Sequence, residues 1–300
     1  MSETILCFHG DYDGVASAAM IIKKYAISNY KTIICEPFTV NRAAAALEAE
    51  PVRERSMFIL DIAPNNRNVK MTKKSIDRFS AIARSVVLYD HHAGWEGMEF
   101  NANVEANIGA GYKSCAGFIY ERLGLKSFSD PIIDSMARDA DIIDTGGYDG
   151  ISDETAVIYR AMKSELKDDV IKAASLNYIL SSYSDQSLKK ILSERAAGYD
   201  KIFLRSLELS KNFIELTPRI CYLNVGMAEC DLTAIIREFY KKYPYAVLEY
   251  ASGGTNYVII ATILPNEDLP AKFGLKSGSR ARITIVKKDL NEIVSRLEAR

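Results

Sequence analysis

Hydrophobic residues follow two alternating patterns along the first hundred residues. Short and nearly continuous apolar runs, such as "TILCFHG" (4–10) and "SMFILDIAP" (56–64), are typical of strands that are buried on both faces. Between such runs, apolar residues recur every three or four positions, as in "GVASAAMIIKKYA" (14–26), which predicts amphipathic helices. This alternation predicts an α/β fold with a parallel sheet and helices on both faces. The remaining expected elements are strands at 31–38 and 85–92 and helices at 41–49 and 69–84.

The middle of the chain has helical spacing. We expect helices at 115–124 and 130–144, the second with Asp130 as its N-cap and Pro131 at its first position. From about residue 153 to 215 the pattern is helical and highly charged. This segment is expected to close the first domain and to lead to a second.

Strand character returns near the C-terminus. We predict strands at 219–225 and 280–286, a pair of strands within 245–265 joined at Gly253–Gly254, and helices at 231–244 and 287–300. The pattern indicates a small α+β domain. We therefore expect an α/β domain over residues 1–155, a helical connector over 156–215 and a smaller α+β domain over 216–300.

Composition narrows the class of protein. The chain has 300 residues, enough for about two domains, and a formal net charge of −1, which attracts neither nucleic acid nor an anionic membrane over its whole surface. Its five cysteines are scattered without a CxxC pair, which fits a reducing compartment. We see no signal-peptide pattern and no apolar run of the roughly 20 residues that a membrane helix needs. A cytoplasmic protein without membrane contact is expected.

Chemistry-bearing side chains gather where the predicted strands end. The three histidines, His9, His91 and His92, all lie in such places. Asp90 comes directly before His91 at the end of the same apolar run, and Asp61 follows a third run. The carboxyl ends of parallel strands meet at one edge of the sheet, where ligands bind. Carboxylates packed together repel one another unless they are protonated or bind cations. Carboxylates suit Mg²⁺ and Mn²⁺, and the imidazoles move the preference toward Mn²⁺, Zn²⁺ or Fe²⁺. The set is large enough for two divalent cations, for which we favour Mn²⁺ and keep Mg²⁺ as an alternative.

Four short stretches then invite comparison with a known family. In order along the chain, "HGDYDG" (9–14), "LDIAP" (60–64), "DHH" (90–92) and "ADIIDTG" (140–146) resemble the four motifs of the DHH phosphoesterase superfamily. This superfamily includes RecJ-type exonucleases, nano-RNases, cyclic-dinucleotide phosphodiesterases and, more distantly, family II pyrophosphatases. The resemblance covers roughly residues 5–150. The last domain resembles, more weakly, the DHHA1 substrate-binding module.

The resemblance implies a set of metal ligands. His9 and Asp11 would hold one Mn²⁺, Asp13 and His91 would hold the other, and Asp61 would bridge both.

The remaining motif residues have less definite roles. Asp90 would act close to the ions, as a ligand or by orienting ligands or water, and His92 would contact the scissile phosphate or the leaving group. For the fourth motif, the "AD" context selects Asp141 and the "DTG" context selects Asp144. We keep both and favour Asp141.

Candidate substrate-binding residues lie outside these motifs. Lys113 and Ser114 open a helix after a glycine-rich loop where a phosphate could bind, although an ordinary helix start explains them equally well. Arg138 could pair with the fourth-motif carboxylates or with a phosphate. The only tryptophan, Trp95, could stack on a base or simply pack a loop.

The last domain departs from the family. In place of its glycine-rich motif with histidine, the chain has "SGGTNY" with Gly253 and Gly254 but no histidine. A basic run could bind phosphate or form a solvated edge; it comprises Lys272, Lys276, Arg280 and Arg282.

These observations predict a two-metal phosphoesterase. Its expected substrates are short single-stranded RNA or DNA or small nucleotides, and a homodimer is compatible with the pattern. One alternative is a pyrophosphatase-like phosphohydrolase. Another is an inactive RecJ-like scaffold that binds nucleic acid, which the complete set of ligand residues disfavours.

Overall fold

The protein forms two compact units, residues 1–197 and 198–300. The structure is a computed structural model that describes residues 3–50, 55–64, 69–148, 150–164, 168–275 and 281–299. Each unit contains one five-stranded sheet. The boundary between the units falls within one long helix, α8 (Gln186–Ser210).

The sheet of the first unit is entirely parallel, with strand order β2-β1-β3-β4-β5. Its strands are β1 (Glu3–His9), β2 (Tyr30–Cys35), β3 (Arg55–Leu60), β4 (Ser85–Asp90) and β5 (Val104–Ile108). The helices of the unit are α1 (Tyr12–Tyr25), α2 (Val40–Glu48), α3 (Val69–Ile82), α4 (Cys115–Arg122), α5 (Pro131–Asp144), α6 (Asp153–Ser164) and α7 (Asp169–Leu180).

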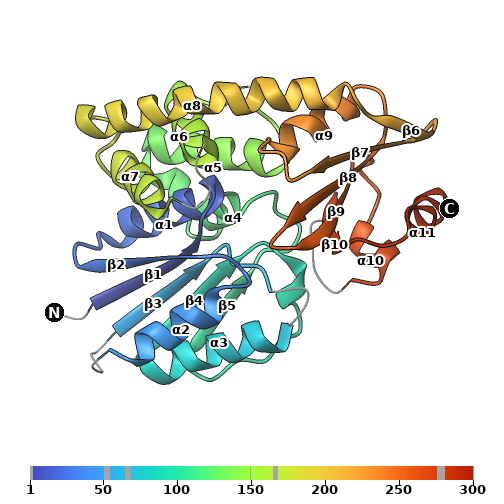
Figure 1. The fold of residues 1–300 in the computed structure, drawn as a ribbon. Coiled ribbons are helices and arrows are strands. Elements are labelled where there is room, and N and C mark those ends of the chain that lie inside the picture. The colour runs from blue at the N-terminus through green and yellow to red at the C-terminus, as the bar shows by residue number, and fades with distance from the viewer. Residues whose placement is uncertain are drawn as a thin grey trace. The chain divides into compact units, whose positions relative to one another are not determined.

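Alternation along the strands explains why this sheet is covered on both faces. Residues such as Cys7 and Ile59 pack on one side against α2 and α3. Leu6 and Phe8, which alternate with Cys7 along β1, pack on the other side against α1 and α4–α7. Figure 1 shows these two helical layers with the sheet between them. The predicted doubly covered parallel sheet is confirmed.

The second unit has a mixed sheet in the order β10-β9-β8-β7-β6, in which only the β7–β8 pair is parallel. Its strands are β6 (Ile214–Thr217), β7 (Ile220–Gly226), β8 (Tyr245–Ser252), β9 (Thr255–Thr262) and β10 (Arg282–Val286), and its helices are α9 (Leu232–Tyr240), α10 (Leu269–Phe273) and α11 (Leu290–Glu298). The predicted α+β character is confirmed.

The helix starts follow the sequence signals. The carboxylate of Asp130 accepts a hydrogen bond from the Ile132 backbone N–H, so the predicted N-cap of α5 is present. Asp231 caps α9 in the same way, by accepting a hydrogen bond from the Thr233 N–H. No helix among the described residues is both long enough and apolar enough to cross a membrane.

The packing of the α2–α3 face provides a test of the fold. Phe79 on α3 is fully buried in the cluster between these helices and the sheet. We expect Phe79→Ala to lower the free energy of unfolding by about 3–5 kcal/mol, because it removes a buried ring and leaves a cavity. Urea denaturation measures the loss. The control is Phe38→Ala, whose ring is 64% exposed and whose removal should cost less than about 0.5 kcal/mol. Equal effects would contradict this packing.

Candidate metal centre

Three adjacent strands of the first sheet deliver the candidate ligands to one edge. β1 ends at His9, β4 ends at Asp90, and Asp61 follows the last residue of β3. Asp61 has a φ of 56°, in the left-handed region that aspartate tolerates better than most residues. Its backbone N–H donates to the Tyr89 carbonyl oxygen at 3.0 Å, which holds this conformation in place. Such strained positions cluster at functional sites.

The Asp61 carboxylate lies between two imidazoles. Its Oδ2 is 3.5 Å from Nδ1 of His9, and its Oδ1 is 3.5 Å from Nε2 of His91. The side chain is only 3% exposed. One carboxylate oxygen therefore faces each of two groups of polar side chains.

The first group is His9, Asp11 and Asp61. Nδ1 of His9 is 2.8 Å from Oδ2 of Asp11, and the opposite ring nitrogen, Nε2, is 2.9 Å from Oε2 of Glu36. The other Asp11 oxygen accepts a hydrogen bond from the Gly14 N–H and thereby caps α1. Asp11 thus serves the helix start and the polar cluster together.

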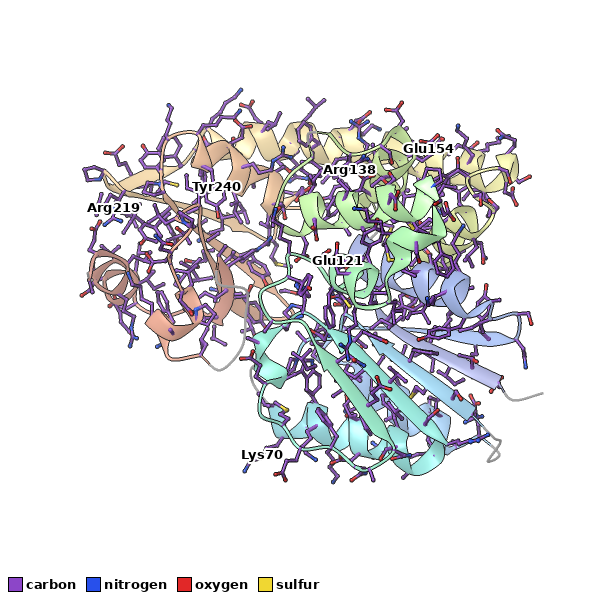
Figure 2. The ribbon with its side chains drawn as sticks, turned by 180° about the vertical axis from the view of Figure 1, so that it is seen from behind. Lys70, Glu121, Arg138, Glu154, Arg219 and Tyr240 are labelled. Carbon is purple, nitrogen blue, oxygen red and sulfur yellow. The ribbon has the colours of Figure 1, made fainter. Side chains whose placement is uncertain are left out.

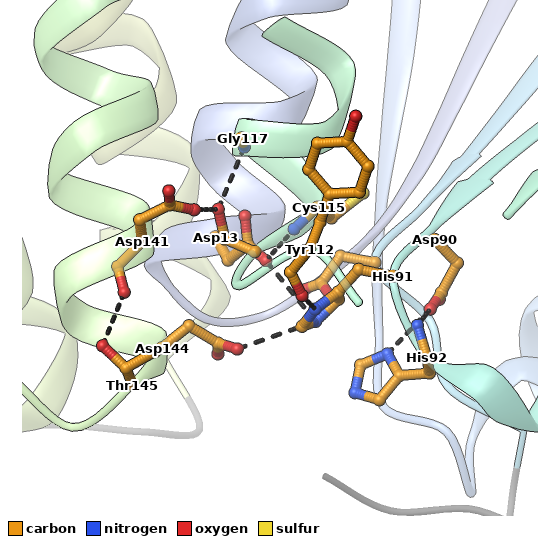
Figure 3. A network of polar contacts seen from close by, with 12 residues as sticks. Asp13, Asp90, His91, His92, Tyr112, Cys115, Gly117, Asp141, Asp144 and Thr145 are labelled. Carbon is orange, nitrogen blue, oxygen red and sulfur yellow. Dashed lines mark hydrogen bonds and ion pairs between the residues drawn. The ribbon is translucent and has the colours of Figure 1, made fainter. Parts of the chain in front are cut away.

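The second group is Asp13, His91 and Asp144. Nε2 of His91 lies 3.9 Å from Asp13 and 3.7 Å from Asp144 (Figure 3). Its Nδ1 lies 3.3 Å from the Tyr112 carbonyl oxygen, which can accept the Nδ1 proton and leave Nε2 free to face the acids. Backbone N–H groups of Cys115 and Ala116 donate to the two Asp13 oxygens, each at 2.7 Å.

Asp90 holds His92. Its Oδ1 is 2.7 Å from Nδ1 of the imidazole and accepts the His92 backbone N–H at 2.6 Å (Figure 3). The imidazole also joins Asp61 and His91 in a third group of possible ligands. His92 is therefore oriented by a fully buried carboxylate, with its second ring nitrogen available for other contacts.

The electrostatics of the site reflect crowded acids. Burial raises the pKa of Asp13 to about 7. Burial, and after it the charges of Asp13 and Asp11, raise the pKa of Asp61 well above its usual range. Burial lowers the pKa of His9, but the carboxylates around the ring, Asp11 first, outweigh it and bring the pKa well above the ordinary value. In the metal-free protein, protons thus offset part of the carboxylate repulsion.

The donor set fits divalent cations. Among the described residues, no lysine or arginine forms an ion pair with Asp13 or Asp61, both of which are buried. Oδ2 of Asp90 is also buried and has no hydrogen-bond partner among the described atoms. Burying a carboxylate without an ion pair or a full set of hydrogen bonds costs free energy. A bound cation, or a water on that cation, would provide the missing partner. Carboxylate oxygens suit Mg²⁺ and Mn²⁺, and imidazole nitrogens shift the preference toward Mn²⁺, Zn²⁺ or Fe²⁺.

The geometry reverses our preference for the fourth-motif aspartate. Asp144, and not Asp141, lies in a ligand group with His91. Asp141 instead accepts a hydrogen bond from the Ser114 hydroxyl at 2.5 Å. Both residues lie on α5, three positions apart, and helical rotation directs them to different neighbours.

The α4 N-terminus does not offer the free amides that a phosphate would need. The Cys115 and Ala116 N–H groups bind Asp13, and the Gly117 N–H binds the buried Ser114 hydroxyl. This corrects the expected phosphate contact at Ser114. Lys113 is exposed.

Trp95 does not serve as an exposed platform for a base. It is 1% exposed, packs with the α2–α3 core cluster, and donates its indole N–H to the Ile62 carbonyl oxygen at 3.0 Å. The packing interpretation is therefore the right one.

The other predicted substrate residues have structural partners. Arg138, on α5 (Figure 2), pairs with Asp139 at 2.8 Å and not with the fourth-motif acids. Arg282 donates to the Thr233 hydroxyl at 3.1 Å. Lys272 pairs with Glu267 at 3.0 Å. Lys276 and Arg280 lie outside the described residues.

Gly253 and Gly254 form the two-residue turn between β8 and β9, where Ser252 pairs with Thr255. Both glycines have positive φ, 56° and 75°. A turn of this kind selects glycine for its backbone conformation, which accounts for the pair without a ligand.

Sequence reasoning missed Glu36. It follows β2 immediately and is not part of any of the four stretches. Its position near His9 follows from the strand pairing. β2 is the neighbour of β1, and His9 is in register with Cys35, the residue before Glu36.

Comparisons with known proteins agree with the fold. No protein-family model matches the sequence, and no curated protein matches it. Solved structures do match over 99% of this chain. RecJ from Thermus thermophilus in complex with Mn²⁺ aligns with a TM-score of 0.63 and 14% identity, and this chain covers 51% of that chain.

Two smaller proteins match over most of their length. An exopolyphosphatase-related protein from Bacteroides fragilis has a TM-score of 0.55, 12% identity and 90% of its chain covered. The pGpG-specific phosphodiesterase PggH from Vibrio cholerae has a TM-score of 0.50, 12% identity and 97% of its chain covered. The protein thus shares the fold of these three structures, which agrees with the resemblance that the four motifs indicated.

The raised pKa values predict how metal-free protein responds to pH. Asp13 and Asp61 hold their protons more tightly when folded than when unfolded. Their contribution to stability is therefore fully present below their unfolded pKa and is lost as the pH rises through the folded pKa. We expect the Tm of EDTA-treated protein to fall between about pH 5 and pH 8. We also expect Mn²⁺ to raise the Tm more at the higher pH, because its ligands must lose protons.

Thermal scans with EDTA and with excess Mn²⁺ measure both effects. Asp13→Asn, which cannot titrate at that position, is the control and should show a smaller decline with pH. A Tm that is flat or rising in EDTA, with a pH-independent shift on adding Mn²⁺, would contradict the account.

Proposed function

We propose that the protein is a two-metal phosphoesterase of the DHH type, with Mn²⁺ as its preferred cation, that hydrolyses phosphodiester bonds in short single-stranded RNA or DNA or in small nucleotides. The observation that carries this proposal is the Asp61 carboxylate, with one oxygen 3.5 Å from His9 and the other 3.5 Å from His91. A buried carboxylate between two acid–imidazole groups is suited to being shared by two cations of a two-metal site.

The chain's own residues divide the work. His9 and Asp11 would hold one cation, and Asp13, His91 and Asp144 the other, with Asp61 shared. Bound cations in such a pair neutralise phosphate charge and make an attacking water more acidic.

His92 and Asp90 would act on the substrate side of the reaction. Asp90 fixes the imidazole through Nδ1. The second ring nitrogen of His92 can then bind a phosphate oxygen or give a proton to the leaving oxygen. The buried, unpartnered Oδ2 of Asp90 suits it to hold a cation or a water beside them.

The activities of two similar proteins support a phosphoester substrate. RecJ is described as an exonuclease bound to manganese, and PggH as a pGpG-specific phosphodiesterase. Because identity to both is low, the choice between oligonucleotides and small nucleotides rests on experiment. Among the predicted substrate contacts, Lys113, Gly253, Gly254, Arg280 and Arg282 stay predictions.

A substrate panel decides between the remaining functions. Purified protein with Mn²⁺ is offered RNA and DNA oligonucleotides of increasing length, cyclic dinucleotides, pAp and pyrophosphate. We expect turnover of short oligonucleotides or nucleotides. Turnover of pyrophosphate alone would identify a pyrophosphatase-like enzyme, and binding of oligonucleotides without turnover would identify an inactive scaffold.

Removing the shared carboxylate tests the mechanism. We expect Asp61→Asn to lower kcat/KM at least about a hundredfold, since the amide cannot bridge two cations. Asparagine keeps the side-chain volume and tolerates the left-handed backbone at this position. The apo Tm should therefore stay near that of the wild type.

His91→Ala should cause a similar loss of activity. The control is Asp77→Asn, which removes a surface carboxylate paired with Lys73 on α3 and should leave kcat/KM unchanged. Full Mn²⁺-dependent activity in Asp61→Asn would refute the shared-carboxylate mechanism.

A further inference from the structure

A carboxylate outside the four motifs contacts the first candidate ligand. Glu36 follows β2 directly, and its Oε2 lies 2.9 Å from Nε2 of His9. The contact depends on strand pairing, because His9 is in register with Cys35 and places Glu36 at the same edge of the sheet. The two side chains therefore meet across neighbouring strands.

This contact holds Nε2 of His9 against Glu36, so that Nδ1 is the nitrogen that faces Asp11 and Asp61. A carboxylate accepts hydrogen bonds and does not donate them, so the Nε2 position carries a proton. In the metal-free protein the Nδ1 position also carries a proton, toward Asp11. A cation that displaced this proton would find a lone pair on Nδ1 while the Nε2 proton stayed in its hydrogen bond to Glu36. Nδ1 lies 2.8 Å from Asp11 and 3.5 Å from Asp61.

We propose that Glu36 is a positioning residue that fixes His9 as the Nε2–H tautomer, with Nδ1 directed to the first cation. The proposal rests on the proposed two-metal function, since it assigns Glu36 a role at that same site. A hydrogen bond from a ligating histidine to an outer carboxylate orients the ring and raises its basicity.

The two cation sites are then built differently. His91 uses the opposite nitrogen, because its Nδ1 lies against the Tyr112 carbonyl oxygen and its Nε2 faces Asp13 and Asp61. A neutral backbone carbonyl therefore orients one histidine, and a charged side chain orients the other. Changes at Glu36 should affect one site and spare the second.

Folding does not require the Glu36 carboxylate. The turn after β2 is held by the backbone of Glu36, whose N–H donates to the Thr39 hydroxyl at 2.9 Å and whose carbonyl oxygen accepts the Thr39 N–H at 2.8 Å. The Glu36 side chain is 37% exposed. A substitution that removes only the carboxylate can therefore keep the turn.

Two substitutions distinguish the hydrogen bond that Glu36 accepts from the negative charge that it carries. Glu36→Leu has a similar size but no acceptor, and Glu36→Gln keeps an amide oxygen that can accept the Nε2 proton. The control is Glu48→Leu, which removes a carboxylate at the end of α2 that pairs with Arg78 on the surface. Electron paramagnetic resonance of free Mn²⁺ gives the binding isotherm for each metal-depleted protein.

For Glu36→Leu we expect one of two Mn²⁺ ions to bind about 10- to 100-fold more weakly, with the other unchanged. Glu36→Gln should lose less Mn²⁺ affinity than Glu36→Leu, and Glu48→Leu should bind both Mn²⁺ ions as tightly as the wild type. Wild-type affinity at both sites in Glu36→Leu, or equal losses at both, would overturn the proposal.

A second readout tests the tautomer directly. In ¹⁵N NMR of Mg²⁺-loaded protein, the three histidines give few signals, and His9→Gln identifies those of His9. We expect a protonated Nε2 and an unprotonated Nδ1, and the reverse would overturn the proposal. Failure of the proposed function gives a different result: the wild type would bind two Mn²⁺ ions yet cleave no phosphodiester, while the Glu36 affinities could still differ as expected.

Discussion

The mutual repulsion of carboxylates at one edge of a buried sheet is the constraint on which this structure depends. Asp13 and Asp61 are almost fully buried. Asp11 and Asp61 both contact Nδ1 of His9, so their carboxylates lie near each other. In water such groups would separate, but the strand ends and the α1 start hold them together. Two features stabilise these neighbouring carboxylates. The imidazoles of His9 and His91 lie between them, and backbone N–H groups at the α4 N-terminus donate hydrogen bonds to Asp13. Positive charge from bound cations would complete the compensation.

A second constraint is the orientation of the imidazoles. Each histidine has one nitrogen near an oxygen acceptor, namely the Glu36 carboxylate, the Tyr112 carbonyl or the Asp90 carboxylate. The other nitrogen of His9 and of His91 faces the acid cluster, which leaves few orientations for either ring. The site is therefore set by contacts between segments far apart in the sequence, with the sheet as the frame that brings them together.

Features that depend on local sequence could be predicted, and features that depend on contacts between distant segments could not. Apolar runs and helical spacing depend on local pattern, so the buried strands β1, β3 and β4 and the capped helix α5 were predictable. The edge strand β5 (Val104–Ile108) was not, because its half-exposed sequence lacks a continuous apolar run. Asp144 could not be separated from Asp141, because their partners come from other elements. Glu36 lay inside the expected strand 31–38 and belonged to no motif, so only the contact with His9 identifies it. Ser114 suited a phosphate contact and an ordinary helix start equally well until its contact with Asp141 was known.

The central claim is that Asp61 is shared by two cations. Anomalous diffraction from crystals of the protein with Mn²⁺ tests it most directly, because the signal locates manganese without reference to activity. The account predicts two anomalous peaks about 3.5–4 Å apart, one beside His9 and Asp11 and the other beside Asp13 and His91, with the Asp61 carboxylate between them. A single peak, or two peaks that Asp61 does not contact, would contradict it.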